Sequence, residues 1–205
     1  MKNQTYFITG ISTEVGKTIA SAIVTQALQA DYWKPVQAGE LHHSDSHTVQ
    51  QLVSNPNTKF HASAFNLETP MSPHAAAKID GVRLSVQQIK RPKTKNNLVI
   101  EGAGGLLVPL NDTQSITDLI LPSDKVIVVS RHYLGSINHT LLTIEALKAR
   151  AIPIFGILFN GEKHPTTEAI IAKMSGVSIL GRIDQEPYFD QNVVKQYAQD
   201  FKSKL

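Results

Sequence analysis

The sequence of 205 residues contains no cysteine, few aromatic residues and no long apolar run. The absence of cysteine excludes disulfide bonds and thiolate metal sites. No apolar run approaches the roughly 18 residues that a membrane-spanning helix requires, so we expect no membrane partner. The chain enters an apolar stretch at Thr5, without the basic start and long apolar segment of a signal peptide. These absences fit a cytoplasmic protein.

Clusters of basic residues are also missing, although the chain carries a small positive charge. Lys and Arg total 20 against 17 Asp and Glu, which gives a net charge of +3 with histidine neutral. The basic residues are scattered, and no run of them alternates with aromatic residues. Because nucleic-acid-binding proteins gather Lys and Arg on one face, we expect no nucleic-acid partner. The excess charge predicts only weak attraction for phosphates and carboxylates.

What the chain does contain is a regular alternation of strand and helix patterns. Its length suits one α/β domain, so we expect a single domain over residues 1–205 with a mostly parallel sheet and helices on both faces. Strands are expected at residues 5–10, 32–36, 98–100, 125–130, 154–159 and 178–183. Helices are expected at residues 17–30, 44–53, 73–80, 85–90, 136–150, 166–174 and 191–202, with residues 56–74 irregular. Pro35 cannot donate a ladder hydrogen bond, so the second strand should lie at an edge or end there.

The most informative stretch lies near the N-terminus, where an apolar run ends at Gly10 and a helical pattern opens at Gly16-Lys17-Thr18. This strand–loop–helix order predicts a phosphate-binding loop and a P-loop NTPase-like fold. Backbone N–H groups and the helix dipole would bind the anion. Lys17 would reach the β- and γ-phosphates, and the Thr18 hydroxyl would ligate Mg²⁺.

The spacing of this loop departs from the general pattern. Five residues separate Gly10 from Gly16, where the general pattern has four. The alternative is a glycine-flanked turn with a surface lysine. The flanking strand and helix patterns favour the phosphate site.

A carboxylate follows the apolar strand at residues 98–100. Glu101 stands at the carboxyl end of that strand, where ligands collect in open parallel sheets, and there it would help to hold Mg²⁺. A solvated carboxylate is the alternative. The glycines that follow, including Gly102 and Gly104, favour a site because they allow the backbone to approach a ligand closely.

Two further charged residues are ambiguous from the sequence. Lys34 taken alone is typical of a solvated lysine at a strand end. Asp45 stands among His42, His43 and His47, but no spacing there matches a zinc site. We therefore expect no transition metal, and favour Asp45 as a Mg²⁺ carboxylate because a phosphate loop needs acidic partners for its metal.

Seven segments in one order together resemble the dethiobiotin synthetase family. They include the loop Gly-x-x-Thr-Glu-Val-Gly-Lys-Thr with its five-residue gap, Lys-Pro-Val, Glu-Gly-Ala-Gly-Gly and Leu-Gly-x-Ile-Asn-His. In this chain the segments fall at residues 10–18, 34–36, 44–45, 72–74, 101–105 and 134–139, and at Asn160. Departures are Ala38, where some relatives carry a hydroxyl residue, Asp184, where a proline is common, and a poor match over the last 25 residues.

The resemblance implies an ATP- and Mg²⁺-dependent ligase of biotin biosynthesis. In this family CO₂ carbamylates 7,8-diaminopelargonate, ATP phosphorylates the carbamate, and the second amine closes the ureido ring to give dethiobiotin, ADP and phosphate. The catalytic residues implied are Lys17, Lys34 and Thr13, and the metal ligands are Thr18, Asp45 and Glu101. ATP would contact Glu14, Val15, Gly16, Lys17, Thr18, Asp45, Glu101 and Asn160. The diamine would contact Thr13, Lys34, Ser72, Pro73, Gly102, Gly104, Gly135, Ser136, Ile137 and Asn138.

Two implied assignments have explicit alternatives. Asn160 is similar to the adenine-contacting residue of the family, but Asn-Gly is also a common turn. The Gly135–Asn138 segment would bind the substrate carboxylate across a homodimer interface, or would be an ordinary capped helix start.

Two other protein classes compete with this interpretation. The first is a partition or cell-division ATPase, but such proteins usually carry a second lysine early in the loop, where this chain has Ile11, Ser12 and Thr13. The second is another amide- or ring-forming ligase of the same superfamily.

Overall fold

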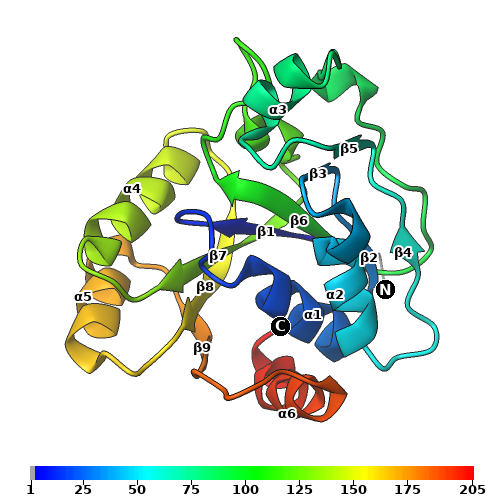
Figure 1. Ribbon diagram of the computed structural model, residues 1–205. Helices are drawn as coiled ribbons and strands as arrows, with labels where there is room; N and C mark the ends of the chain where they lie inside the picture. Colours follow the sequence, from blue (N-terminus) through cyan, green and yellow to red (C-terminus); the bar gives the residue numbers. More distant parts are fainter. Residues whose placement is uncertain (1–2) are drawn as a thin grey trace.

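A parallel sheet of seven strands forms the centre of the molecule (Figure 1). The structure is a computed structural model, and it describes residues 3–205. The strands follow the order β4-β2-β6-β1-β7-β8-β9, and every neighbouring pair is parallel. Their bounds are β1 Thr5–Gly10, β2 Asp31–Trp33, β4 Phe60–His61, β6 Leu98–Gly105, β7 Lys125–Arg131, β8 Ile154–Asn160 and β9 Ile179–Ile183. The fold class predicted from the alternation of strands and helices is confirmed.

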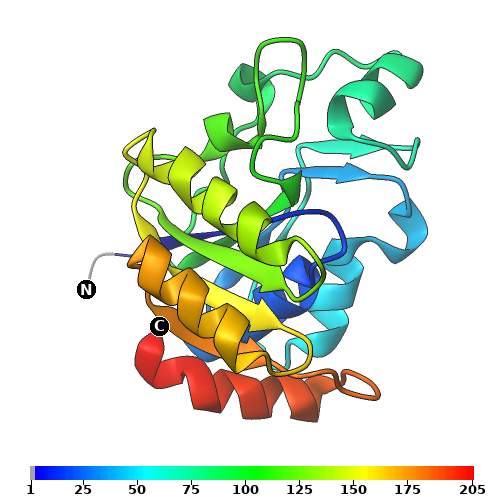
Figure 2. The same cartoon turned by 90° about the vertical axis from the view of Figure 1, so that its left-hand side faces the viewer.

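Helices cover both faces of the sheet, which buries the central strands completely. On one side α1 (Lys17–Leu28) packs with α2 (Asp45–Leu52) and α6 (Gln191–Phe201), and on the other α4 (Ser136–Lys148) packs with α5 (Pro165–Ser175) (Figure 2). The run Val126–Val129 in β7 is fully buried. An unbroken apolar run is typical of a parallel strand that is covered on both faces.

The second predicted strand is interrupted rather than continuous. β2 ends at Trp33, β3 (Val36–Ala38) begins after Pro35, and β2 lies between β4 and β6 instead of at the edge. Because proline cannot donate to the ladder, the chain leaves the main sheet there and β3 pairs with β5 (Phe65–Leu67) in a separate two-stranded sheet. Lys34 lies in this break.

Three other predicted boundaries need correction. The stretch at 56–74 contains β4 and β5, which are too short to leave a periodic pattern. The strand predicted at 98–100 continues as β6 to Gly105, because Glu101 and Gly105 still pair with Ile8 and Gly10 of β1. The helix predicted at 85–90 is a 3₁₀ turn, Val86–Gln88, whereas α3 (Pro73–Ile79) is close to its predicted range.

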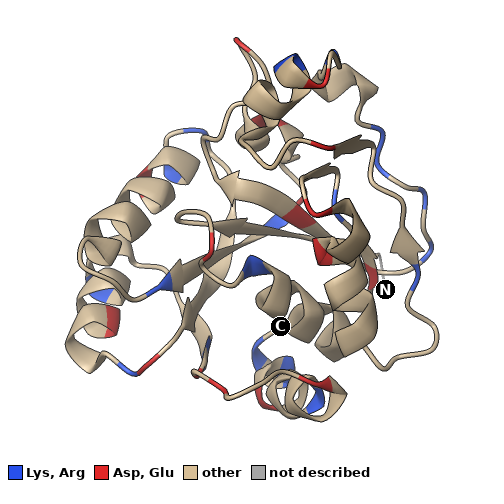
Figure 3. Ribbon diagram, in the orientation of Figure 1, with Lys and Arg blue, Asp and Glu red and all other residues tan. Residues whose placement is uncertain are grey.

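The outer surface carries mixed charge. In the view of Figure 3, Lys and Arg are spread over several helices and loops, and Asp and Glu lie among them. Within residues 3–205, no helix is long and apolar enough to cross a membrane.

Candidate active site

The predicted phosphate loop connects β1 to α1 at the carboxyl edge of the sheet. Gly16 precedes α1 with φ of 92°, and no side chain caps the helix start. A Cβ at Gly16 would stand 2.3 Å from Nδ2 of Asn160. The backbone angle and the lack of space therefore both require glycine. The first N–H groups of α1 remain available to an anion.

Lys17 is the first residue of α1 and is buried, with 7% of its surface exposed. It does not lie in a surface loop, as the sequence had suggested. Its ammonium donates to the Ser12 carbonyl at 3.0 Å. Burial lowers the pKa of Lys17 to about 8, an effect that the Glu101 carboxylate opposes and Lys34 reinforces. A buried cation without a paired carboxylate of its own is well suited to bind phosphate.

A cluster of charges lies beside this loop. The Lys34 ammonium donates to Glu101 Oε1 at 3.0 Å and also forms an ion pair with Asp45. The Thr18 hydroxyl lies 2.9 Å from Asp45 Oδ1 and 3.0 Å from Glu101 Oε1. The Tyr32 hydroxyl donates to Glu101 Oε2 at 2.9 Å. Both Lys34 and Glu101 are almost completely buried, so Lys34 is not a solvated strand-end lysine.

Opposite charges in this cluster favour the ionised forms of Lys34 and Asp45. Burial lowers the pKa of Lys34, but the carboxylates of Glu101 and Asp45 outweigh it, and the pKa lies above its usual value. Burial raises the pKa of Asp45, but Lys34 and the Thr18 hydroxyl outweigh this and leave it below its usual value. Burial and the nearby Glu101 charge raise the pKa of Tyr32 well above its usual range, so its hydroxyl remains a donor.

The oxygen atoms in this cluster fit the ligand set of Mg²⁺. One hydroxyl oxygen, from Thr18, lies within 3.0 Å of oxygens from two carboxylates, Asp45 and Glu101. Mg²⁺ prefers oxygen ligands and usually takes one or two carboxylates, with substrate phosphates and water completing its shell. Across residues 3–205, no group of three or more His, Cys, Asp or Glu side chains could hold a metal ion.

A cavity of about 710 Å³ opens over the phosphate loop and this cluster. Most of the residues predicted to bind ATP, Mg²⁺ or the diamine line this cavity: Thr13, Glu14, Gly16, Lys17, Thr18, Lys34, Asp45, Ser72, Pro73, Glu101 and Gly104. Val15 is buried behind the loop, where only its backbone can contribute. Gly102 lies outside the cavity lining, and a Cβ there would press on Phe7 and Ile116, so packing explains this glycine.

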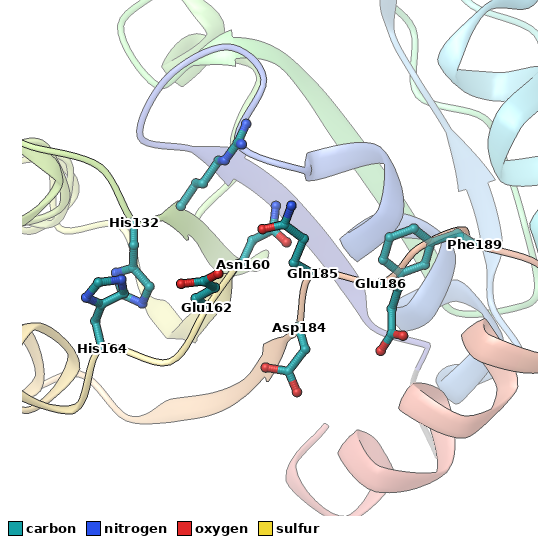
Figure 4. A pocket seen from close by; sticks show the side chains of 10 residues that line it. His132, Asn160, Glu162, His164, Asp184, Gln185, Glu186 and Phe189 are labelled. Atoms are coloured by element: carbon teal, nitrogen blue, oxygen red, sulfur yellow. The ribbon is translucent and has the colours of Figure 1, made fainter.

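Asn160 lies apart from this cavity, at the end of β8. Its amide donates to the Val15 carbonyl at 2.9 Å, which ties it to the back of the phosphate loop. It also lines a second cavity, of about 280 Å³, formed with the ends of β7 and β9 and the segments that follow β8 and β9 (Figure 4). The wall of this cavity is mostly polar: Arg131, His132, Asn160, Gly161, Glu162, His164, Asp184, Gln185, Glu186 and Phe189. Asn160 is therefore more than a turn residue.

The start of α4 does not reach the larger cavity within one chain. Gly135, with φ of 102°, precedes the helix, and the Ser136 N–H donates to the Tyr133 carbonyl at 2.9 Å. In the described part of the chain, only the N–H groups of Ile137 and Asn138 remain without an acceptor at this helix start. Between α4 and the phosphate loop runs an apolar groove of about 440 Å³, whose lining includes Thr13, Val108 and Leu142.

Two residues at the site were missed from the sequence: Tyr32, which donates to Glu101, and Glu40, which lines the larger cavity. Tyr32 precedes Lys34 by two residues, and this spacing puts two side chains on one face of an extended chain. The spacing could therefore have predicted that Tyr32 lies beside Lys34 at Glu101. Glu40 lines the cavity with φ of 52°, an unusual angle for a residue other than glycine. Nothing in the local sequence pointed to Glu40.

Comparisons with known proteins agree with this geometry. A family model described as an AAA domain matches residues 4–193. The ATP-dependent dethiobiotin synthetase BioD of Christiangramia forsetii is 63% identical over 202 residues, covering 98% of each chain. The protein of the same name from Cytophaga hutchinsonii is 51% identical and covers 94% of each chain. The chain belongs to both families, the AAA domain proteins and the dethiobiotin synthetases.

Membership in this family assigns the chain its activity. It is an ATP-dependent ligase that catalyses ring closure in biotin biosynthesis, with ATP and Mg²⁺ as cofactors. The resemblance seen in the sequence is thereby confirmed.

Solved structures that are similar to this chain share its fold. A plasmid partition protein of Borrelia burgdorferi bound to AMPPNP superposes with a TM-score of 0.61, at 15% identity, over 100% of this chain and 99% of that one. The septum site-determining protein MinD of Pyrococcus horikoshii, complexed with Mg-ADP, gives a TM-score of 0.58 at 13% identity, over 100% and 90%. At such low identity the likeness concerns the fold alone.

Proposed function

We propose that residues 1–205 act as one ligase domain that converts 7,8-diaminopelargonate, CO₂ and ATP into dethiobiotin, ADP and phosphate. One amine takes up CO₂ to give a carbamate, the γ-phosphoryl group of ATP passes to a carbamate oxygen, and the second amine displaces phosphate to close the ring. The observation that carries this proposal is the single cavity that joins a phosphate loop to the buried cluster of Lys34, Asp45 and Glu101. A cytoplasmic location belongs to the same proposal, because the reaction consumes ATP.

Lys17 and Lys34 balance the negative charge of the reactants. A carbamate and a triphosphate at contact distance repel each other, and buried cations offset that repulsion strongly because the local dielectric constant is low. Lys17 serves the β- and γ-phosphates from the helix start. Lys34 serves the carbamate and the transferring phosphoryl group. Phosphoryl transfer depends mainly on such positioning and charge neutralisation.

The remaining cavity residues hold the metal and the substrate. Thr18, Asp45 and Glu101 would hold Mg²⁺, which would supply positive charge to offset that of the phosphates. Thr13 contacts the reacting end of the diamine, and Ser72, Pro73 and Gly104 line its path. Asn160 contacts the adenine from the second cavity.

The reaction is tested by measuring ADP release from the purified protein with ATP and Mg²⁺. Release should require both diaminopelargonate and bicarbonate, each omitted in turn, and mass spectrometry should identify dethiobiotin as the product. ADP release that persists at the same rate without the diamine would contradict the proposal. Release that depends instead on DNA or lipid would indicate an ATPase switch.

We propose further that the protein is a homodimer whose substrate site is shared. The aliphatic chain of the substrate separates its carboxylate from its amines, and the start of α4 offers two unbonded N–H groups outside the reacting cavity. Exposed apolar side chains on and near α4 support an interface: Leu107, Leu134, Ile137 and Leu142. The segment Gly135, Ser136, Ile137 and Asn138 of one chain would bind the carboxylate of the substrate whose amines lie in the other.

Subunit mixing tests the shared site. Lys17→Ala inactivates the phosphate half, and Ser136→Pro removes the N–H that shapes the helix start. Random re-association gives about half mixed dimers, each with one intact site, so about a quarter of the parental activity should return. If exchange is confirmed independently and no activity returns, the site is not shared in this way.

A further inference from the structure

The loop between β9 and α6 forms one wall of the cavity at Asn160. Asp184, Gln185, Glu186 and Phe189 from this loop line the cavity together with Asn160 from β8 (Figure 4). The loop has no regular secondary structure, so its position depends on contacts with neighbouring elements. A binding wall of this kind contributes to affinity only while it is held in place.

One side chain of α6 fastens this loop through two hydrogen bonds. The Tyr197 hydroxyl donates to Glu186 Oε1 at 2.6 Å and accepts from the Asp184 N–H at 3.0 Å. Burial, followed by the nearby Glu186 carboxylate, raises the pKa of Tyr197 to about 12. The hydroxyl therefore stays protonated near neutral pH and keeps its donor role.

The helix that carries Tyr197 is itself firmly docked. Asp190 caps α6 by accepting from the N–H groups of Asn192 and Val193, both at 2.9 Å. The Phe201 ring packs so closely on β9 that a Cβ at Gly181 would stand 2.3 Å from it. α6 also packs against α1, the helix that follows the phosphate loop. Tyr197 thus connects a packed helix to a loop without regular secondary structure.

The ion pair that also restrains the loop is weaker than the Tyr197 contact with Glu186. Arg182 pairs with Asp184 at 3.2 Å, but the Asp184 side chain is 57% exposed, and exposed ion pairs contribute little. The bond from the Tyr197 hydroxyl to Glu186 is charge-assisted and partly buried, which makes it the stronger restraint.

We infer that Tyr197 is a positioning residue for the nucleotide base. By fixing Asp184 and Glu186, it keeps the wall opposite Asn160 in the shape that receives adenine. The exocyclic amino group of adenine is a donor, which suits the carboxylate and amide acceptors of this cavity. This inference rests on the proposed assignment of the cavity to the base. Loss of the hydroxyl would free the loop, and ATP binding would then have to order it.

The test compares ligands that do and do not carry a base. Tyr197→Phe removes only the hydroxyl and leaves the ring packing intact. Calorimetry with Mg²⁺ should show ATP bound about tenfold more weakly, which corresponds to about 1.4 kcal/mol, while inorganic tripolyphosphate binds as before. The KM for ATP should rise by the same factor, with kcat and the KM for the diamine unchanged.

A matched control lies in the same loop. Tyr188 is 66% exposed and does not line the cavity, so Tyr188→Phe should leave all these values at the parental level. Unchanged tripolyphosphate binding and an unchanged melting profile show that each variant is folded.

Two results would overturn the inference. One is ATP affinity within twofold of the parent in Tyr197→Phe, and the other is an equal loss for ATP and tripolyphosphate, which would indicate a general structural effect. Asn160→Ala separates this failure from failure of the base site. If Asn160→Ala weakens ATP selectively and Tyr197→Phe does not, only the role of Tyr197 is wrong. If Asn160→Ala also leaves the affinity for ATP unchanged, the base binds elsewhere. The assignment of this cavity to the base and the role of Tyr197 are then both wrong.

Discussion

The two cavities at the carboxyl edge of the sheet are built in different ways. The larger one is lined by β3, β6 and the start of α1, and at its base the buried Lys34 pairs with the buried Glu101 and with the partly exposed Asp45. The smaller one, beside Asn160, is walled mostly by loops with exposed carboxylates. The first has its geometry fixed by the core, whereas the second depends on a few side-chain restraints.

This difference predicts unequal sensitivity to mutation. Buried charges act through a low dielectric constant, so removing one changes both catalysis and stability. Removing a side chain from a loop wall should weaken ligand binding only by the free energy of one or two hydrogen bonds. Substitutions in the larger cavity should therefore have larger effects than those in loops.

Lys17→Ala should have the largest effect. It removes the cation closest to the phosphate loop, and we expect kcat to fall by about a thousandfold or more. Activity within about tenfold of the parent, a barrier change under about 1.4 kcal/mol, would contradict the role of Lys17. A single cooperative melting transition above the assay temperature serves as the control for folding.

Lys34→Ala should lower kcat by about a hundredfold and leave ATP affinity nearly unchanged. It also leaves Glu101 and Asp45 facing each other without a cation, so the free energy of unfolding should fall. Added Mg²⁺ should restore part of that stability, because the ion replaces the missing charge. Normal turnover at saturating diamine would mean that Lys34 only stabilises the fold.

Glu101→Gln and Asp45→Asn should each raise the Mg²⁺ concentration needed for half-maximal activity, by about tenfold. Each substitution keeps the size of the side chain and removes a negative charge from the metal site. The measurement is a Mg²⁺ titration of ADP release at saturating ATP and diamine. Curves that coincide with the parental curve for both variants would exclude these residues as ligands.

Asp80→Ala should have the smallest effect, because Asp80 acts on a loop. Its carboxylate accepts from the N–H groups of Glu68 and Thr69 at 2.7 and 3.3 Å, and from the Thr69 hydroxyl at 2.5 Å. These bonds hold the segment that carries Ser72 to the cavity. We expect the KM for the diamine to rise about threefold to tenfold, with the KM for ATP unchanged. Asp112→Ala, at an exposed loop position, is the matched control.

Local patterns allowed part of the site to be predicted. The phosphate loop was readable because Gly10, Gly16 and Lys17 lie within one strand–loop–helix unit, whose geometry follows from nearby residues. Glu101 was placed correctly at the sheet edge by the apolar run before it. The length of β6 was underestimated, because Gly105 pairs with Gly10 of β1, a contact that no local pattern encodes.

Long-range contacts decided the remaining features. Lys34 resembles a solvated lysine until α2 and β6 bring Asp45 and Glu101 against it. Gly102 looks like a ligand-contacting glycine, but its place in the sheet puts Phe7 and Ile116 beside it.

The sequence alone determined the strand–helix order, the phosphate loop, the family and the identity of the chemical groups. These depend on residue types and on spacings within a few turns of chain. Only the tertiary structure decided which charges are buried together and which loop wall Tyr197 restrains. Burial and electrostatic pairing are properties of neighbours in space, and folding brings together residues as distant as Lys34 and Glu101.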